Sequence, residues 1–127
     1  MTRASDLPSS FRHVRLVLAR ESGHPEGTVE EGYDLLLPLD SDRRIDAGLW
    51  KANAEHCRVR SFGKGPDRIG RLRRKPGGQY YLDYADGEQD DEAGFRLGEE
   101  KFVPGEYVSI RQADGMHTYR VARVEKP

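Results

Sequence analysis

The sequence predicts a single domain that is mostly β-strand: a small antiparallel barrel or half-barrel of six to eight short strands with one short helix. Segments in which apolar and polar residues alternate recur from Phe11 to Val124, and turns rich in glycine and proline separate them. Helical periodicity is confined to residues 46–56. Because the exposed edges of a small open sheet promote pairing between chains, closure or strong curvature is the favoured architecture.

Length and composition limit the class of protein. A chain of 127 residues can bury one core without disulfides or metals. Residues 1–10 are polar and predict a disordered tail, which leaves residues 11–127 as one β-rich domain. The single cysteine, Cys57, cannot form an internal disulfide, and no segment has the pattern of a secretory signal or the apolar length of a membrane helix. We therefore expect a cytoplasmic protein without a membrane partner.

The first half of the chain predicts a strand pair followed by the helix. Residues 11–20 and 33–39 alternate, and a loop rich in glycine and proline joins them as an antiparallel pair. Asp46 can cap the helix because its carboxylate accepts hydrogen bonds from the free N–H groups of the first turn. Ile45 and Trp50 have the spacing of a hydrophobic staple. We expect this helix to cover one end of the core.

The second half predicts further short strands, several of them joined as hairpins. They cover residues 58–62, 67–74, 79–84, 95–97, 106–112 and 116–124. In the turn at residues 75–78, proline fixes φ at the second position and glycine accepts a positive φ at the third. Asp114–Gly115 is a pair preferred in tight hairpins. In the last strand the apolar residues change face between Val121 and Ala122, which indicates a bulge or a strand buried on both sides.

The charges are separated along the chain although the formal net charge is only -1. Residues 58–75 contain eight arginines and lysines and one aspartate, whereas residues 83–100 contain eight carboxylates and one arginine. A net charge near zero provides no overall attraction for nucleic acid or anionic lipid. Any such attraction would have to come from the local distribution.

Residues 58–75 provide the main candidate site. Alternation puts the arginines of each of two strands on one face, so neighbouring strands would form one cationic surface with a tyrosine beside it. Barrels that bind single-stranded nucleic acid combine cations along a backbone track with aromatic faces for bases. The candidate nucleic-acid or polyanion-binding residues are Arg58, Arg60, Arg71, Arg73, Arg74, Lys75 and Tyr81. The alternative is a solvated, partly neutralised face, because outward positions of a strand in a soluble protein are polar in any case.

The acidic loop at residues 86–92 suggests a second function. Its carboxylates could bind a protein partner, so a protein-interaction adaptor is the alternative to a polyanion-binding module. The same loop could also fold back over the arginines and screen them. It lacks the fixed ligand spacing of an EF-hand, and we predict no metal and no other cofactor.

Catalysis is the least favoured function. Cys57 would act as a nucleophile only if the fold brought a base such as His13 or His117 close to it. His56 is adjacent to Cys57, but neighbouring residues at a helix end direct their side chains differently. Spacing alone assembles no group of nucleophile, base and orienting residue, so we expect binding and not enzymatic activity.

Three segments prompt a comparison with a known family. They are Cys57-Arg58-Val59-Arg60-Ser61-Phe62, Ile69-Gly70-Arg71-Leu72 and Phe102-Val103-Pro104-Gly105-Glu106-Tyr107-Val108-Ser109-Ile110. With them, the chain resembles a family of small uncharacterised proteins from alpha-proteobacteria over nearly its full length. The resemblance implies no activity that could be transferred.

Overall fold

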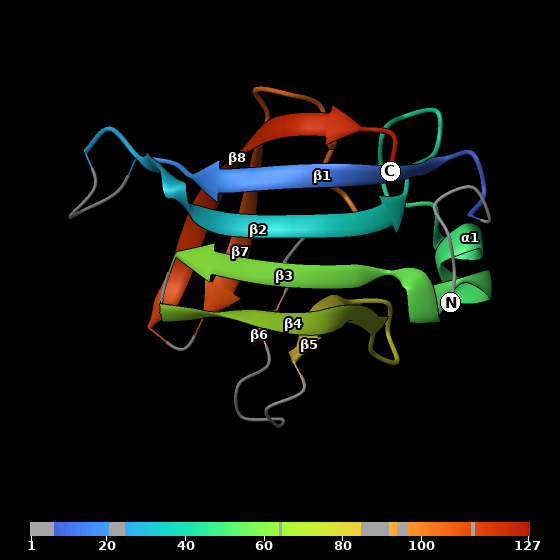
Figure 1. The fold of residues 1–127 in the computed structure, drawn as a ribbon. Helices are drawn as coiled ribbons and strands as arrows, with labels where there is room; N and C mark the ends of the chain where they lie inside the picture. The colour runs from blue at the N-terminus through green and yellow to red at the C-terminus, as the bar shows by residue number, and fades with distance from the viewer. Residues whose placement is uncertain (1–6, 21–24, 64, 85–91, 94–96, 113) are drawn as a thin grey trace.

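The strands form one closed antiparallel ring, in which each strand pairs with the next along the chain and β8 returns to β1 (Figure 1). The structure is a computed structural model that describes residues 7–20, 25–63, 65–84, 92–93, 97–112 and 114–127. Eight strands lie within these residues, which confirms the predicted mostly β, antiparallel fold class. The strand pairing around the ring is least extensive at β6, which has two residues. A single described register pair, Ala93 with Arg111, joins β6 to β7.

The elements follow the predicted order. The strands are β1 (Phe11–Leu18), β2 (Thr28–Pro38), β3 (Arg58–Gly63), β4 (Gly65–Arg74), β5 (Tyr80–Tyr84), β6 (Glu92–Ala93), β7 (Tyr107–Gln112) and β8 (Gly115–Glu125). Between β2 and β3 lie the helix α1 (Ala47–Ala52) and the single 3-10 turn η2 (Ala54–His56).

The interior of the barrel is a packed apolar core. Alternate residues of the strands point inward and are buried, as Val59 is between Arg58 and Arg60 on β3. None of the charged side chains in the described ranges is buried. The largest fully buried side chains are Tyr33, Tyr119, Phe11, Phe102, Leu16, Leu18, Leu35, Leu37, Leu72, Leu82, Leu97 and Ile110. A filled interior leaves the outer surface and the two ends of the barrel for binding.

The helix α1 covers one end of the barrel (Figure 1). As predicted, Asp46 caps it: Oδ1 accepts from the Leu49 N–H at 3.0 Å. The Trp50 indole N–H donates to the Leu72 carbonyl at 2.9 Å, which ties the helix to β4. The helix is shorter than the predicted range because Asn53 leaves the helical conformation at φ -130°, and its side-chain amide donates to the Leu49 carbonyl at 3.0 Å.

Two predicted turns differ in outcome. The turn at residues 75–78 is confirmed: the Gly78 N–H donates to the Lys75 carbonyl at 2.9 Å, and Gly77 has φ 100°. The β7–β8 turn is displaced, because Gly115 already pairs with Gln112 as part of β8. Asp114–Gly115 is therefore not the centre of that turn.

The change of face in the last strand is a bulge, one of the two predicted alternatives. Along β1, the partner of Arg15 is Arg123 and the partner of Leu16 is Val121, so Ala122 has no partner in β1. The bulge lets residues on both sides of Ala122 keep apolar contacts with the core, since Val121 is buried and Val124 packs partly against it.

The expected tail is only partly described. Residues 1–6 lie outside the described residues, but residues 7–10 contact the barrel. Leu7 packs against the core, the Pro8 carbonyl accepts from the Phe11 N–H at 3.0 Å, and the Ser10 carbonyl accepts from the Leu39 N–H at 3.1 Å. Most of the strand expected at residues 95–97 also lies outside the described residues, and Leu97 belongs to a turn.

We expect Asp46→Ala to lower the free energy of unfolding by about 1 kcal/mol, because the substitution leaves the N–H groups of the first turn of α1 without a side-chain acceptor. Urea denaturation measures the loss. Asp46→Asn is the matched control, since its amide oxygen can still accept from Leu49, and it should lose less than half as much. Equal losses in both variants would show that the cap does not stabilise the protein.

Candidate functional site

The register of the barrel brings the predicted arginines of β3 and β4 onto one outer face. Arg58 of β3 lies opposite Arg71 of β4, and Arg60 lies opposite Ile69. Arg73 follows Arg71 on the same side of β4, and the residues between these arginines are buried. The expectation that the two basic strands are neighbours is therefore correct.

Two of these arginines are neutralised by carboxylates of the same chain. The Arg60 guanidinium contacts Asp34 Oδ2 at 3.0 Å through Nη2 and Asp67 Oδ2 at 3.1 Å through Nη1. Arg73 Nε donates to an Asp83 carboxylate oxygen across the β4–β5 pair. The charges of Arg60 and Arg73 are therefore compensated within the chain, which weakens their attraction for an external anion.

Arg58 and Arg71 remain uncompensated. In the described part of the chain, neither has a carboxylate within ion-pair distance. The Leu72 N–H donates to the Cys57 carbonyl at 2.9 Å, which makes Arg58–Arg71 a non-hydrogen-bonded pair. In such pairs the two side chains are closest, and like charges directly opposite each other are unfavourable. The side chains of Arg58 and Arg71 therefore leave neighbouring strands side by side on the outer face.

Of the remaining predicted residues, Arg74 and Lys75 lie at the β4–β5 turn, and Tyr81 lies on β5 opposite Arg73. Arg74 Nε donates to the Gly78 carbonyl at 3.0 Å, and its guanidinium carbon lies 5.3 Å from the centre of the Tyr80 ring. Lys75 Nζ lies 5.4 Å from the centre of the Tyr81 ring, a cation–π contact. Tyr81 is thus in contact with Lys75 of the turn, and it does not line the hollows on the outer face of β3 and β4.

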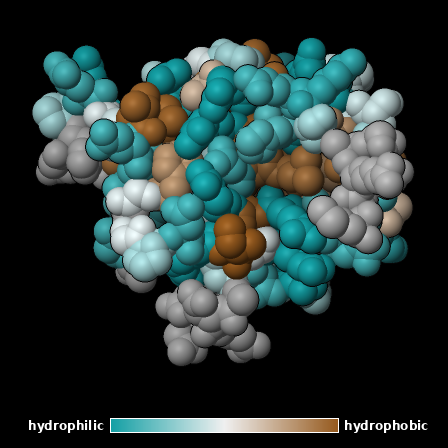
Figure 2. Space-filling view, in the orientation of Figure 1, coloured by the Kyte–Doolittle hydropathy of each residue, from teal (hydrophilic) through white to brown (hydrophobic). Residues whose placement is uncertain are grey.

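Two adjoining hollows cross this face, and we call them together the basic groove. The first, of about 610 Å³, is lined by His13, Asp34, Leu35, Leu36, Arg58, Val59, Arg60, Ile69, Lys126 and Pro127. The second, of about 440 Å³, is lined by Arg58, Ile69, Gly70, Arg71, Arg73, Asp83 and Tyr84. Arg58 and Ile69 line both, so the two hollows adjoin at these residues. Figure 2 shows the outer face of β1–β4 as small apolar patches among hydrophilic residues.

Several lining residues were not found from the sequence. His13 is on β1 beside Leu36 of β2, and Lys126 is in the chain end after β8, which only the pairing of β8 with β1 brings to this face. Ile69 could have been found, because it is in phase with Arg71 and must point outward with it. It is 54% exposed, an unusual apolar residue among outward charges.

One end of the basic groove is fixed by internal charge pairs. Asp34, whose side chain is only 12% exposed, contacts two arginines, Arg60 at 3.0 Å and Arg15 Nε at 3.7 Å, and lies 3.6 Å from His13 Nε2. The guanidinium carbons of Arg15 and Arg60 also lie 4.5 Å and 5.4 Å from the centre of the Phe62 ring. These contacts hold the side chains in place and leave the β3–β4 part as the uncompensated part of the groove.

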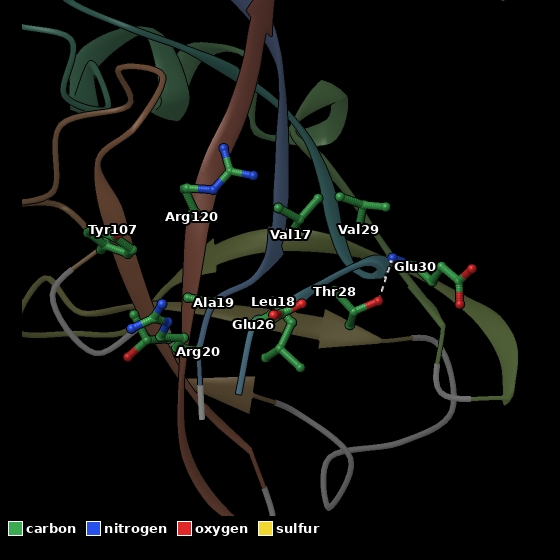
Figure 3. A pocket seen from close by; sticks show the side chains of 12 residues that line it. Val17, Leu18, Ala19, Arg20, Glu26, Thr28, Val29, Glu30, Tyr107 and Arg120 are labelled. Carbon is green, nitrogen blue, oxygen red and sulfur yellow. Dashed lines mark hydrogen bonds between the residues drawn. The ribbon is translucent and has the colours of Figure 1, made fainter. Parts of the chain in front are cut away.

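A third hollow, of about 730 Å³, lies across β7, β8 and the β1–β2 hairpin (Figure 3). Tyr107, Arg120 and Val17 are consecutive neighbours on its floor, and Val29 stands on the side away from Tyr107. Tyr107 is 57% exposed and Val29 69% exposed. Carboxylates line this hollow as well as arginines, so it has no preference for anions. Its lining charges are those of Arg20, Glu26, Glu30 and Arg120.

Cys57 is unsuited to nucleophilic chemistry. The side chain is fully buried, its thiol donates to the Asn53 carbonyl at 3.6 Å, and burial raises its pKa to about 12. The thiolate, which is the reactive form, is therefore scarce near neutral pH. His56 Nε2 contacts the Glu55 carboxylate at 3.5 Å.

Most of the predicted acidic loop at residues 86–92 lies outside the described residues, which end at residue 84 and resume at residue 92. Its last residue, Glu92, is not in a loop but in β6, opposite Leu82 of β5. Whether the loop covers the arginines, and whether it binds a protein, remain predictions. Among the side chains that the structure describes, no group of three histidine, cysteine or carboxylate residues is arranged to hold a metal ion. No helix in the described ranges is long and apolar enough to cross a membrane.

Comparisons with known proteins add no family to this geometry. No protein-family model matches the chain, and no curated protein or solved structure matches it significantly. The resemblance to small alpha-proteobacterial proteins therefore stays a prediction, and the proposals below depend on the residues alone.

Alkylation should test the chemical state of Cys57. We expect the folded protein at pH 8 to react with iodoacetamide at least a hundredfold more slowly than the urea-unfolded chain, because burial raises the thiol pKa to about 12. Since the folded pKa exceeds the unfolded one, this thiol should also lower stability as the pH rises from about 9 towards 12. Native alkylation at the unfolded rate would contradict the buried position.

Proposed function

We propose that the chain is a binding module for a polyanion, which docks on the basic groove through Arg58 and Arg71. The observation that carries the proposal is the pairing of these two arginines directly opposite each other with no carboxylate of the described chain between them. A merely solvated face would gain from neutralising this pair, as it does for Arg60 and Arg73 nearby.

A phosphate group fits the chemistry of this pair. Guanidinium groups present their N–H donors as planar forks, which bind phosphate oxygens with two hydrogen bonds each. An anion between Arg58 and Arg71 would convert a repulsive contact into two attractive ones. The packed interior and the buried Cys57 thiol support binding at the surface as the activity, and not chemistry in a cavity.

The expected affinity is moderate and falls modestly with salt. With one phosphate of a single strand neutralised between Arg58 and Arg71, the slope of log K against log salt concentration is about -0.7. Affinity should then fall about two- to threefold between 50 and 200 mM salt. The net charge of -1 provides no further attraction at long range, so binding depends on the groove itself.

Removing the two arginines should abolish most of the binding. We expect Arg58→Gln/Arg71→Gln to weaken binding of a fluorescein-labelled 12-nucleotide single-stranded RNA at least tenfold at 50 mM salt, measured by fluorescence anisotropy. The control Arg20→Gln/Arg120→Gln removes the same charge from the hollow across β7 and β8 and should change affinity less than twofold. Equal losses in both variants, or no binding of either the RNA or inorganic polyphosphate by the unaltered protein, would contradict the proposal.

The same pair should also affect stability. We expect Arg71→Gln to raise the free energy of unfolding by a few tenths of a kcal/mol at 20 mM salt, because it relieves repulsion with Arg58, and the gain should vanish at 1 M salt. Urea denaturation without ligand measures it. Arg73→Gln is the matched control: it leaves Asp83 without its partner and should not stabilise. Destabilisation by Arg71→Gln at low salt would show that the pair is not repulsive.

A further inference from the structure

We infer that the ligand of the basic groove is a single-stranded nucleic acid, with a base packed on Ile69 and Leu36 beside a phosphate held by Arg58 and Arg71. This inference rests on the proposed function, and it narrows the polyanion to one whose charges alternate with apolar, planar groups.

Ile69 provides the first argument. It points outward from β4, between the side chain of Arg71 on its own strand and that of Arg60 across the β3–β4 pair. At 54% exposure it forms an apolar surface in the middle of a charged face, where it contributes little to the core. Because Ile69 lines both hollows, any ligand that extends along the groove must pass over it.

Leu36 extends this apolar floor towards β2. It packs partly against the core and lines the larger hollow, with His13 opposite it on β1. Arg58 on β3 therefore lies between the strand of Leu36 and the strand of Ile69, Arg71 follows Ile69 on the outer side of β4, and Lys126 lines the hollow near Leu36. From β1 to β4 there are three strand intervals, or about 14 Å, which is room for more than one ligand group.

This arrangement favours nucleic acid over simpler polyanions. Polyphosphate has charges but no apolar surface, so it would leave Ile69 and Leu36 unused. A nucleotide chain supplies both, because each phosphate is followed by a base whose face packs on apolar side chains. In the described parts of β3 and β4, the positively charged residues on the outer face are arginines. Their planar guanidinium groups both bind phosphates and stack on bases.

A variant of Ile69 separates the two kinds of ligand. Ile69→Thr keeps a β-branched residue suited to a strand but removes most of the apolar surface. We expect it to weaken binding of the labelled 12-nucleotide RNA about three- to tenfold and to change binding of inorganic polyphosphate of similar charge less than twofold. Ile69→Phe, which enlarges the apolar surface, should keep or increase the RNA affinity.

The controls distinguish a failure of this inference from a failure of the proposed function. Val29→Thr makes the same kind of change at another exposed position and should leave both affinities unchanged. Arg71→Gln should weaken both ligands. The inference is wrong if Ile69→Thr leaves RNA binding unchanged or weakens both ligands equally. It is also wrong if the unaltered protein binds polyphosphate, or an acidic peptide with an apolar side chain, as tightly as RNA. In each of these cases polyanion binding itself stands. If neither RNA nor polyphosphate binds, the proposed function itself is wrong.

Discussion

The closed antiparallel ring decides which side chains of this protein can meet a ligand. In every strand alternate residues enter a packed apolar core, so Val59 and Leu72 are fixed inside by the same backbone that fixes Arg58 and Arg71 outside. Because the interior is filled, the ring cannot act as a container, and its chemistry lies on the outer face. What that face can do then depends on the register between neighbouring strands.

The register distributes the charges unevenly. Asp83 stands opposite Arg71 yet pairs with Arg73, and Arg58 is left facing Arg71 alone. A tight approach between β4 and β5 supports this register: a Cβ on Gly70 would lie 2.4 Å from the Asp83 carbonyl oxygen. A larger residue there would push the strands apart or shift their pairing. The uncompensated charge of the basic groove is thus a property of the backbone as much as of the arginines.

The sequence carried most of the fold but only part of the site. Alternation of apolar and polar residues was sufficient to predict most of the strands and the outward position of Arg58 and Arg71. Both depend on the two-residue repeat of each strand and on the residues of the turns between them. It could not identify Asp34 as the partner of Arg60, because that contact needs the order and register of β2 and β3. Alternation placed Tyr81 on the outer face of its strand, but the ring is in cation–π contact with Lys75 of the turn. Alternation also places Ile69 outward, but an aliphatic side chain has no charge or ring that would by itself indicate a ligand.

Two local rules of stable β-proteins have exceptions in this barrel, and one exception to each rule lies in the basic groove. Like charges are normally kept from direct cross-strand contact, and outward positions of central strands are normally polar. Arg58 with Arg71 breaks the first rule and Ile69 breaks the second, within two adjacent strands. Exceptions outside the groove include the exposed Val29 and the pair of Arg15 with Arg123, but those two arginines each have a carboxylate within ion-pair distance, Asp34 and Glu125. Elsewhere on the same face, Arg60 between Asp34 and Asp67 obeys both. Features that cost stability on their own persist where another requirement favours them, and their coincidence in one groove is the physical reason for placing the ligand there.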